Sequence, residues 1–461
     1  FNEKLHRVST AASQGLFFFF LRDSNGEKEC QELIQAVLKY LAESTKGHAT
    51  FVAATQKDIP DNFTQVLEKL EAKIHWQQWH LPTVAVPKPE SAVQECYLDG
   101  WRPGVVQYKV DVVTSVISSA TFFRRKEGIK LKQKLFHELL QDEAFLGEIS
   151  THDLEELATN PLKGILSGKI AFIHVDGNKF GSIRRKLCST EMDRANFDKT
   201  IQSDFREIFL RELLIQAKAQ PDFQTVTKKG ERALRLEVLL WGGDEMTLIV
   251  PAWKGFEVIK LFYSKAAQLQ FKGELLTHRA AIIFCHHNAP VLLIRQLAEE
   301  LLARTKNDIL KSSLTALQPH SPVDQIDKPQ GASVLNHKNG DALHYLVLES
   351  IDSLRGDLET YLTNYYKGVG YQELLITAEE LDELLSACRE IQANAAHSQV
   401  LRIIKAVQDN NADAIEKLSN QVIQLAPAEN RSSLHNAIQS LTRFDIGRWY
   451  MASDLWDYLT K

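Results

Sequence analysis

The sequence is poor in cysteine and contains no paired cysteine motif. Its five cysteines are odd in number, lie far apart and never form a Cys-x-x-Cys pair; they are Cys30, Cys96, Cys188, Cys285 and Cys388. This pattern disfavours a disulfide-stapled secreted domain and a cysteine-ligated zinc site. We therefore expect a reduced, cytoplasmic compartment.

Long hydrophobic runs are also missing. The run at residues 15–21 contains four consecutive phenylalanines but ends before Arg22, far short of the about 20 residues that a membrane span needs. It predicts a buried strand, and we expect no membrane partner. No basic segment followed by an apolar stretch and a cleavage site marks a secretion signal. The chain opens at Phe1 rather than at methionine, which suggests a trimmed start with room for an upstream domain.

Charge of one sign is not in excess either. The formal net charge of −5 argues against a nucleic-acid coat protein, although local basic patches on such a chain can still bind phosphates. What is present is enough apolar material for a full core. With 461 residues, 44% hydrophobic and 25% charged, the chain is long enough for about three globular domains.

The first part of the chain predicts a small α/β domain and a basic linker. Over residues 1–90 the expected order is strand, helix, strand, helix, at residues 16–21, 27–42, 49–54 and 62–74. Residues 91–164 form a linker segment with a basic helix from about 122 to 140. The basic residues of this helix fit a solvated face or, alternatively, a phosphate- or RNA-binding patch; they are Arg124, Arg125, Lys126, Lys130, Lys132 and Lys134.

Residues 165–316 have the most regular pattern. Strand, helices, hairpin, helix, strand and helix are expected in that order, with strands at 170–175, 236–241, 246–250 and 279–285 and helices around 197–209, 258–269 and 291–306. This is the order of a ferredoxin-like palm, so the predicted fold class is α+β. A Pro-rich linker at 317–331 closes this domain.

Residues 340–461 predict a helical bundle docked on the palm. Thr377 and Glu380 have the spacing of a capping box, in which the hydroxyl and the carboxylate satisfy two free backbone donors. Further helices are expected around 400–407, 412–425 and 434–441. An apolar helix face follows the capping box, with Leu381, Leu384, Leu385, Cys388 and Ile391.

Two short motifs carry acidic residues at strand ends. Asp176 ends a buried strand and precedes Gly177, while Asp244 and Glu245 follow Gly242 and Gly243 at a hairpin tip. Each motif alone is also typical of an ordinary turn. Together they would bring Asp176 and Asp244 side by side in a central antiparallel pair, where unpaired carboxylates repel one another unless a cation joins them. Mg²⁺, or Mn²⁺, suits carboxylates together with substrate phosphates.

Two further positions stay open between a structural and a functional interpretation. Lys306 ends the expected helix at 291–306, where it either complements the helix dipole or reaches a substrate phosphate. His286, His287 and Asn288 directly follow a strand and are either turn residues or a metal-binding trio.

These motifs resemble the palm of the GGDEF and CRISPR-polymerase superfamily, most closely the polymerase-like large subunit of type III CRISPR effectors. The likeness rests on Asp176-Gly177-Asn178-x-Phe180-Gly181, Gly242-Gly243-Asp244-Glu245, His286-His287-Asn288-x-Pro290 and Leu301-Leu302-x-x-x-Lys306. It is specific over 165–310, moderate over 340–461, where it implies a thumb-like helical domain, and vague before residue 90, where it implies a degenerate first palm. Asp244 follows Asp176 by 68 positions, a larger separation than we expect in a diguanylate cyclase.

The resemblance implies a nucleotidyltransferase that makes cyclic oligoadenylate from ATP in antiviral defence. Asp176, Asp244 and Glu245 would be catalytic, and these three residues with Gly177 would hold the metal. Nucleotide would be bound by Asn178, Phe180, Gly242, Gly243 and Lys306. Implied partners are ATP or other nucleoside triphosphates, RNA or guide-RNA effector subunits, and a second copy of the chain.

One departure from the family pattern and two alternatives remain. The family often has Gly-Gly-Asp-Asp where this chain has Glu245, and a longer acid could reposition a second metal. We identify no His-Asp nuclease pair in the sequence upstream of the palm. The DNA cleavage known in relatives is therefore not implied for this chain. The alternatives are a synthase of cyclic dinucleotides and a catalytically silent scaffold that binds nucleotide or RNA. Only one metal site per chain is expected.

Overall fold

A computed structural model describes most of the chain and divides it into two compact units. The described residues are 5–11, 14–20, 26–45, 49–56, 63–80, 94–100, 102–110, 113–140, 149–315, 340–349, 357–369, 374–443 and 445–459. The first unit comprises residues 1–143 with 181–200, and the second comprises residues 144–180 with 201–461. The expected linker at 317–331 lies outside the described residues. The predicted domain bounds remain predictions.

The first unit contains two hairpins and five helices among its described residues. The strands are β1 (Leu5–Ala11) with β2 (Gln14–Phe19), and β3 (Val106–Val110) with β4 (Val113–Ile117). The helices are α1 (Gly26–Ser44), α2 (Phe63–His80), α3 (Ser119–Leu140), α5 (Phe180–Leu187) and α6 (Glu191–Ile201). The predictions of α1, α2 and the basic helix α3 are confirmed.

One strand prediction in this unit is wrong, and a second is right about the strand but wrong about its burial. Residues 49–54 are extended but form no strand, because no described segment pairs with them. The phenylalanine run does form β2, but it is not buried: Phe17 and Phe20 are 46% and 56% exposed. Its only described strand partner is β1, so the run lies in a two-stranded hairpin instead of the middle of a covered sheet.

The second unit is built on a six-stranded mixed sheet in the order β15-β14-β13-β6-β10-β9. Its strands are β6 (Lys169–Gly177), β9 (Glu237–Gly242), β10 (Glu245–Pro251), β13 (His278–His286), β14 (Ala342–Val347) and β15 (Ile376–Thr377). β6 and β13 are apolar and buried over almost their whole length, which is typical of strands covered on both faces. Among the described pairs of this sheet, β13 with β14 is parallel and the others are antiparallel. The predicted α+β class is confirmed.

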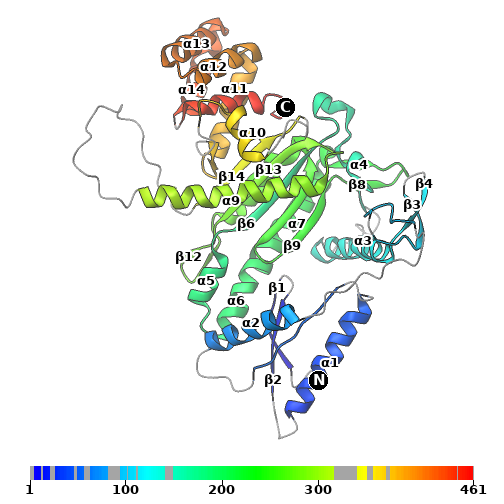
Figure 1. Cartoon of the computed structure of the whole chain (residues 1–461). Helices are drawn as coiled ribbons and strands as arrows, with labels where there is room; N and C mark the ends of the chain where they lie inside the picture. The colour runs from blue at the N-terminus through cyan, green and yellow to red at the C-terminus, as the bar shows by residue number, and fades with distance from the viewer. Residues whose placement is uncertain are drawn as a thin grey trace. The chain divides into compact units, whose positions relative to one another are not determined.

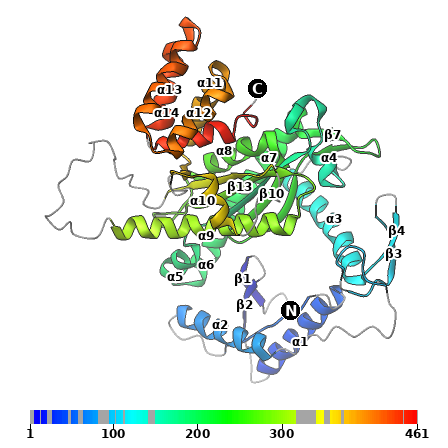
Figure 2. The ribbon, with the colours of Figure 1, turned by 45° about the horizontal axis from the view of Figure 1, so that its top comes forward.

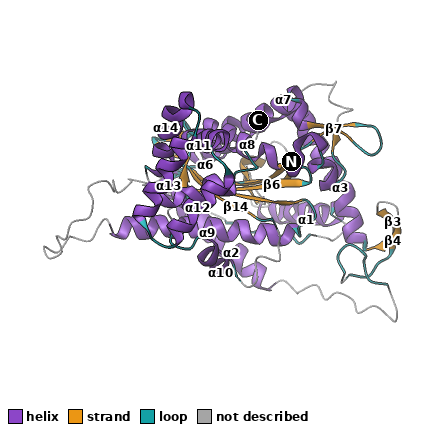
Figure 3. Cartoon of the chain, turned by 90° about the horizontal axis from the view of Figure 1, so that it is seen from above, coloured by secondary structure: helices purple, strands orange, loops and turns teal. Residues whose placement is uncertain are grey.

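Helices cover both faces of this sheet. α8 (Gly255–Ala266) packs on one face of β6, and α9 (Val291–Thr315) packs on β6 and β13 from the other. Figure 1 shows α9 lying across the strands, and Figure 3 shows α8 and α9 on opposite sides of β6. α7 (Glu207–Ala219) contacts α8. The approach of α8 is close, because a Cβ atom built on Gly255 would come within 2.7 Å of the Ala171 Cβ. The alternation of side chains along β6 therefore separates an α8 face from an α9 face.

The helix expected around residues 197–209 is interrupted. A π-helical turn, η3 (Gln202–Arg206), separates α6 from α7. Phe205 and Phe209 are buried as expected, but Ile208 is 43% exposed. The inserted π turn changes the side-chain phase along the helix, which a fixed helical period does not anticipate.

The C-terminal helices form a bundle in the second unit, seen together in Figure 2. They are α10 (Leu358–Tyr365), α11 (Leu381–Asn394), α12 (His397–Gln408), α13 (Ala412–Leu425), α14 (Arg431–Thr442) and α15 (Trp449–Asp454). The capping box is confirmed: Glu380 N donates to Thr377 Oγ1 at 3.3 Å, and Thr377 N donates to Glu380 Oε2 at 3.2 Å. The five apolar residues of α11 are buried as predicted.

The remaining short elements of the second unit are α4 (Leu154–Ala158), β5 (Ile149–Ser150), β7 (Gln224–Val226), β8 (Arg232–Leu234), β11 (Gln270–Phe271) and β12 (Glu274–Leu275). No helix among the described residues combines the length and the apolar character needed to cross a membrane.

Candidate active site

The two acidic motifs meet at the carboxyl end of β6. The antiparallel register pairs Val175 with Met246, and it continues to a hydrogen bond of 3.2 Å from Gly177 N to Asp244 O. A Cβ atom built on Gly177 would lie 2.9 Å from the Asp244 Cβ and 2.8 Å from the Phe180 ring. Glycine at 177 is therefore what lets the two turns approach so closely.

The hairpin tip is shaped by its second glycine. Gly243 has a φ of +58°, in the left-handed region that glycine adopts without steric cost. Glu245 pairs with Gly242 across the tip, where β9 passes into β10. The tip itself carries no side chain at 242 and 243, so a ligand could approach the backbone beside Asp244.

The turn after β6 is held by its own contacts. Asn178 N donates to Thr277 O at 2.8 Å, and Asn178 Nδ2 donates to Thr277 Oγ1 at 2.9 Å. Lys179 has a φ of +59°, which is uncommon for a residue with a side chain. Phe180 is buried and packs edge-on against His278, with 5.1 Å between ring centres. Both predicted nucleotide contacts, Asn178 and Phe180, thus shape the turn, and their nucleotide-binding role remains a prediction.

The acidic residues act on one another electrostatically. Partial burial raises the pKa of Glu245, and the negative charges of Asp176 and Asp244 raise it further, while Arg295 opposes the shift. Arg295 lies on α9 and donates to Glu299 at 2.7 Å. This local excess of negative charge is the condition that favours binding of a cation or of a cationic group.

A buried polar pair lies on the α9 face of the sheet, next to the acidic turns. His174 Nδ1 lies 2.8 Å from Thr247 Oγ1, across the pair of strands β6 and β10. Burial lowers the pKa of His174, although the charge of Asp176 opposes the shift. A neutral, hydrogen-bonded histidine at this place is part of the core that positions Asp176.

Arg206 is a site residue that the sequence did not indicate. Its Nη1 donates to Gly243 O at 2.8 Å, and its guanidinium lies over the Trp241 ring, with 4.3 Å from Cζ to the ring centre. The residue is only 4% exposed. A single charged residue inside a helical apolar pattern is usually a surface residue, and only the π turn at 202–206 directs this one toward the hairpin tip.

Lys306 turns out differently from one expectation, whereas the histidine pair fits the turn interpretation. Lys306 does not end its helix, because α9 continues to Thr315; no glycine or proline follows until Pro319, so the dipole interpretation is wrong. The side chain of Lys306 lies outside the described residues. His286 Nδ1 lies 2.8 Å from Asn288 Oδ1 and the His286 ring contacts that of His287, which are contacts within one turn.

The carboxylates only partly fit the expected metal. Among the described residues, no group of three or more His, Cys, Asp or Glu side chains is arranged to hold a metal ion. Asp176, Asp244 and Glu245 are therefore not a preformed set of three ligands. One or two carboxylates completed by substrate phosphates and water is nevertheless the usual donor set for Mg²⁺, and the mutual repulsion at Glu245 fits such a set.

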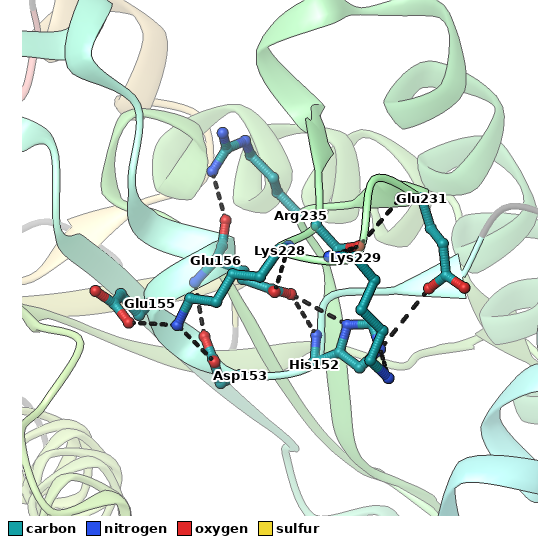
Figure 4. A network of polar contacts seen from close by, with 9 residues as sticks. His152, Asp153, Glu155, Glu156, Lys228, Lys229, Glu231 and Arg235 are labelled. Carbon is teal, nitrogen blue, oxygen red and sulfur yellow. Dashed lines mark hydrogen bonds and ion pairs between the residues drawn. The ribbon is translucent and has the colours of Figure 1, made fainter. Parts of the chain in front are cut away.

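A second cluster of charged side chains, shown in Figure 4, is a structural network held by hydrogen bonds and ion pairs among its own residues. Glu156 accepts from His152 N and from Lys228 N, each at 2.9 Å. Burial would raise the pKa of Glu156, but these hydrogen bonds together with that of the His152 ring lower it. Arg235 Nη1 donates to the carbonyls of Glu156 and Leu157. The network fastens α4 to β8 and its preceding turn, and it leaves no polar group directed at a ligand.

Comparison with known proteins adds no family. No protein-family model matches this sequence, and no curated protein matches it. The resemblance to the CRISPR-polymerase palm therefore rests on the quoted motifs alone.

Proposed function

We propose that the chain is a metal-dependent nucleotidyltransferase that makes cyclic oligoadenylate-type second messengers from ATP in antiviral defence. The observation that carries this proposal is the meeting of two acid-bearing turns: the hydrogen bond from Gly177 N to Asp244 O joins the turn after Asp176 to the Gly242–Glu245 hairpin tip. A nucleotidyltransferase needs acids held together at an accessible backbone, where a triphosphate can approach.

The order of the strands supports a ferredoxin-like palm. Counted along the chain, β6, β9, β10 and β13 are first to fourth, and in space they lie in the order fourth, first, third, second. All three neighbouring pairs are antiparallel. Helices precede β9, β13 and the C-terminal extension of the sheet, as in a split βαβ unit. β14 and β15 then extend the sheet beyond β13.

Specific residues would share the work at this site. Asp176, Asp244 and the Gly177 carbonyl would hold Mg²⁺ or Mn²⁺, with Glu245 beside them. When bound, such an ion supplies positive charge between the carboxylates and the phosphates. Gly242 and Gly243 would leave space for the nucleotide, and Lys306 would face a phosphate from α9. The attacking group would be a ribose hydroxyl, and the leaving group pyrophosphate.

The direct test is turnover of labelled ATP or GTP with Mg²⁺, with and without cellular RNA. A variant with Asp244→Ala and Glu245→Ala should make no product, because it loses two of the three carboxylates. The matched control carries Asp413→Ala and Glu416→Ala, which removes the same charge from the exposed side of α13. Its product yield should equal that of the unchanged chain.

The outcomes separate the alternatives. A cyclic product from ATP supports the proposal, whereas a product from GTP alone supports the cyclic-dinucleotide alternative. Product that persists in the double variant at the hairpin tip would place the chemistry elsewhere. Nucleotide or RNA binding without any product, in every condition, would support the silent scaffold. RNA, other effector subunits or a second copy of the chain are the proposed activators.

A further inference from the structure

Arg206 occupies an unusual place in the second unit. It ends η3 (Gln202–Arg206), the one π-helical turn among the described residues. Such turns are rare and frequently occur at functional sites, because the extra residue redirects a side chain. Here the neighbouring Phe205 packs on the His278 ring in the core, with 5.2 Å between ring centres, while Arg206 reaches the hairpin tip.

Within the described part of the chain, one edge of the Arg206 guanidinium makes a hydrogen bond and the other does not. Nη1 donates to the Gly243 carbonyl at 2.8 Å. Nε and Nη2 are buried, and neither has a hydrogen-bond partner among the described residues. These two nitrogens lie on the same side of the planar group, where their N–H bonds form a fork that matches two oxygens of a carboxylate or a phosphate.

The described residues around Arg206 fix the position of the guanidinium but accept no hydrogen bond from Nε or Nη2. Trp241 lies under the guanidinium, with 4.3 Å from Cζ to the ring centre, and the carboxylates of Asp244 and Glu207 act on it through their charge. Burial lowers the pKa of Arg206 to about 10, although the charge of Asp244 opposes the shift. A buried cation with two unused donors is costly, so an anionic ligand that completes it would bind with a clear gain.

We propose that the Nε–Nη2 edge of Arg206 binds two oxygens of a nucleotide phosphate held at the Gly242–Glu245 tip. This inference rests on the proposed function, since it takes the nucleotide as the ligand. The Gly243 carbonyl orients the guanidinium. Arg206 is then a substrate-binding residue on the side of the tip formed by η3, distinct from Lys306 on α9.

The test measures nucleotide binding, not turnover. ATP, GTP, ADP, AMP and adenosine are titrated in Mg²⁺ into the full chain and into Arg206→Gln, Arg206→Lys and Arg211→Gln variants. Arg211 lies one turn further along, on the exposed side of α7, and serves as the matched control. Circular dichroism and melting temperature confirm that each variant folds.

Arg206→Gln should bind the preferred triphosphate about 10- to 100-fold more weakly, which corresponds to two lost charge-assisted hydrogen bonds. Arg206→Lys should be nearly as weak, because lysine keeps the charge but not the fork. The Arg211→Gln variant should bind normally. The loss should disappear for adenosine, which has no phosphate.

Three results would overturn the inference. If the unchanged chain binds ATP or GTP and Arg206→Gln binds it equally well, Arg206 only supports the tip and the proposed function still stands. If Arg206→Lys restores full affinity, a fork is not what binds the phosphate. If the unchanged chain binds no nucleotide, the inference and the proposed function fail together.

Discussion

At the scale of single residues, the candidate site depends on glycine more than on its acids. Acidic residues at strand ends are common, but Gly177 is placed where any side chain would collide with Asp244 and Phe180. The distance between the two acidic turns is therefore set by a residue that has no side chain. Arg206 adds a contact to the hairpin tip by donating a hydrogen bond to the Gly243 carbonyl.

Gly177→Ala should destabilise the protein and separate the two turns. The added methyl group must displace the Phe180 ring or the Asp244 backbone, and overpacking of this kind costs about 1–3 kcal/mol. Urea unfolding followed by circular dichroism measures the loss, and nucleotide turnover should fall in the same variant.

Gly181→Ala is the matched control for this substitution. A Cβ atom at Gly181 meets nothing within 4 Å, and the residue lies in α5, where alanine is the better helix former by about 1 kcal/mol. The control should be as stable as the unchanged chain or more so. Equal stability of Gly177→Ala and Gly181→Ala would show that residue 177 has room for a methyl group beside Asp244.

At the scale of elements, a buried carboxylate joins a strand to two helices. Asp454 on α15 accepts hydrogen bonds from Tyr345 on β14 at 3.2 Å, and from Tyr365 and Tyr366 at the end of α10 at 2.7 and 2.9 Å. Burial raises the pKa of Asp454 to about 6, although the three hydroxyl donors act in the opposite direction. The C-terminal bundle is thus anchored to the sheet by a titratable group.

Asp454→Asn should change the pH dependence of stability. A folded-state pKa of about 6 lies above the unfolded value of 3.8, so folding favours the neutral acid. Asp454 then lowers the stability of the folded chain as the pH rises from about 4 to about 6, by about 3 kcal/mol at most. Asparagine is neutral throughout and keeps an oxygen that accepts from tyrosine.

Urea unfolding at pH 4 and pH 7.5 checks this expectation. Relative to the unchanged chain, Asp454→Asn should be more stable at pH 7.5 than at pH 4, while an Asp413→Asn control on the exposed side of α13 should show no such difference. A variant that loses more stability at pH 7.5 than at pH 4 would mean that the ionised Asp454 is the favoured form.

At the scale of the whole molecule, the central sheet crosses the boundary between two predicted domains. β14 belongs to the segment expected to form the helical bundle, yet it pairs in parallel with β13 over six residue pairs. Tyr458, near the C-terminus, packs on Phe284 of β13 with 4.8 Å between ring centres. The predicted palm segment and the C-terminal segment therefore share one core.

A chain that ends at residue 316 should consequently be insoluble or self-associated. It would expose the backbone edge of β13, whose residues from 278 to 285 are all buried in the complete chain, and an apolar unpaired edge readily pairs with another molecule. Size-exclusion chromatography with light scattering compares it with the full chain. A soluble, monomeric chain that ends at residue 316 would show that the predicted palm is self-sufficient.

The sequence alone was sufficient for most elements of the second unit and for the two acidic motifs. Strong periodicity predicts β6, β10, β13 and α8, because buried strands and amphipathic helices need apolar residues at fixed spacing. The same patterns were insufficient for residues 49–54 and for the phenylalanine run, because a strand exists only if a partner pairs with it. The local sequence does not determine which segment that partner is.

What the tertiary structure alone decided is how distant segments complete the candidate site. The sequence determined that Asp176 and Asp244 end strands at glycine turns, since local turn chemistry specifies that much. Two features depend on contacts between residues far apart in the chain. One is the π turn that directs Arg206 to the Gly243 carbonyl, and the other is the pairing of β14 with β13. Such contacts follow from packing of the whole core, which no local pattern encodes.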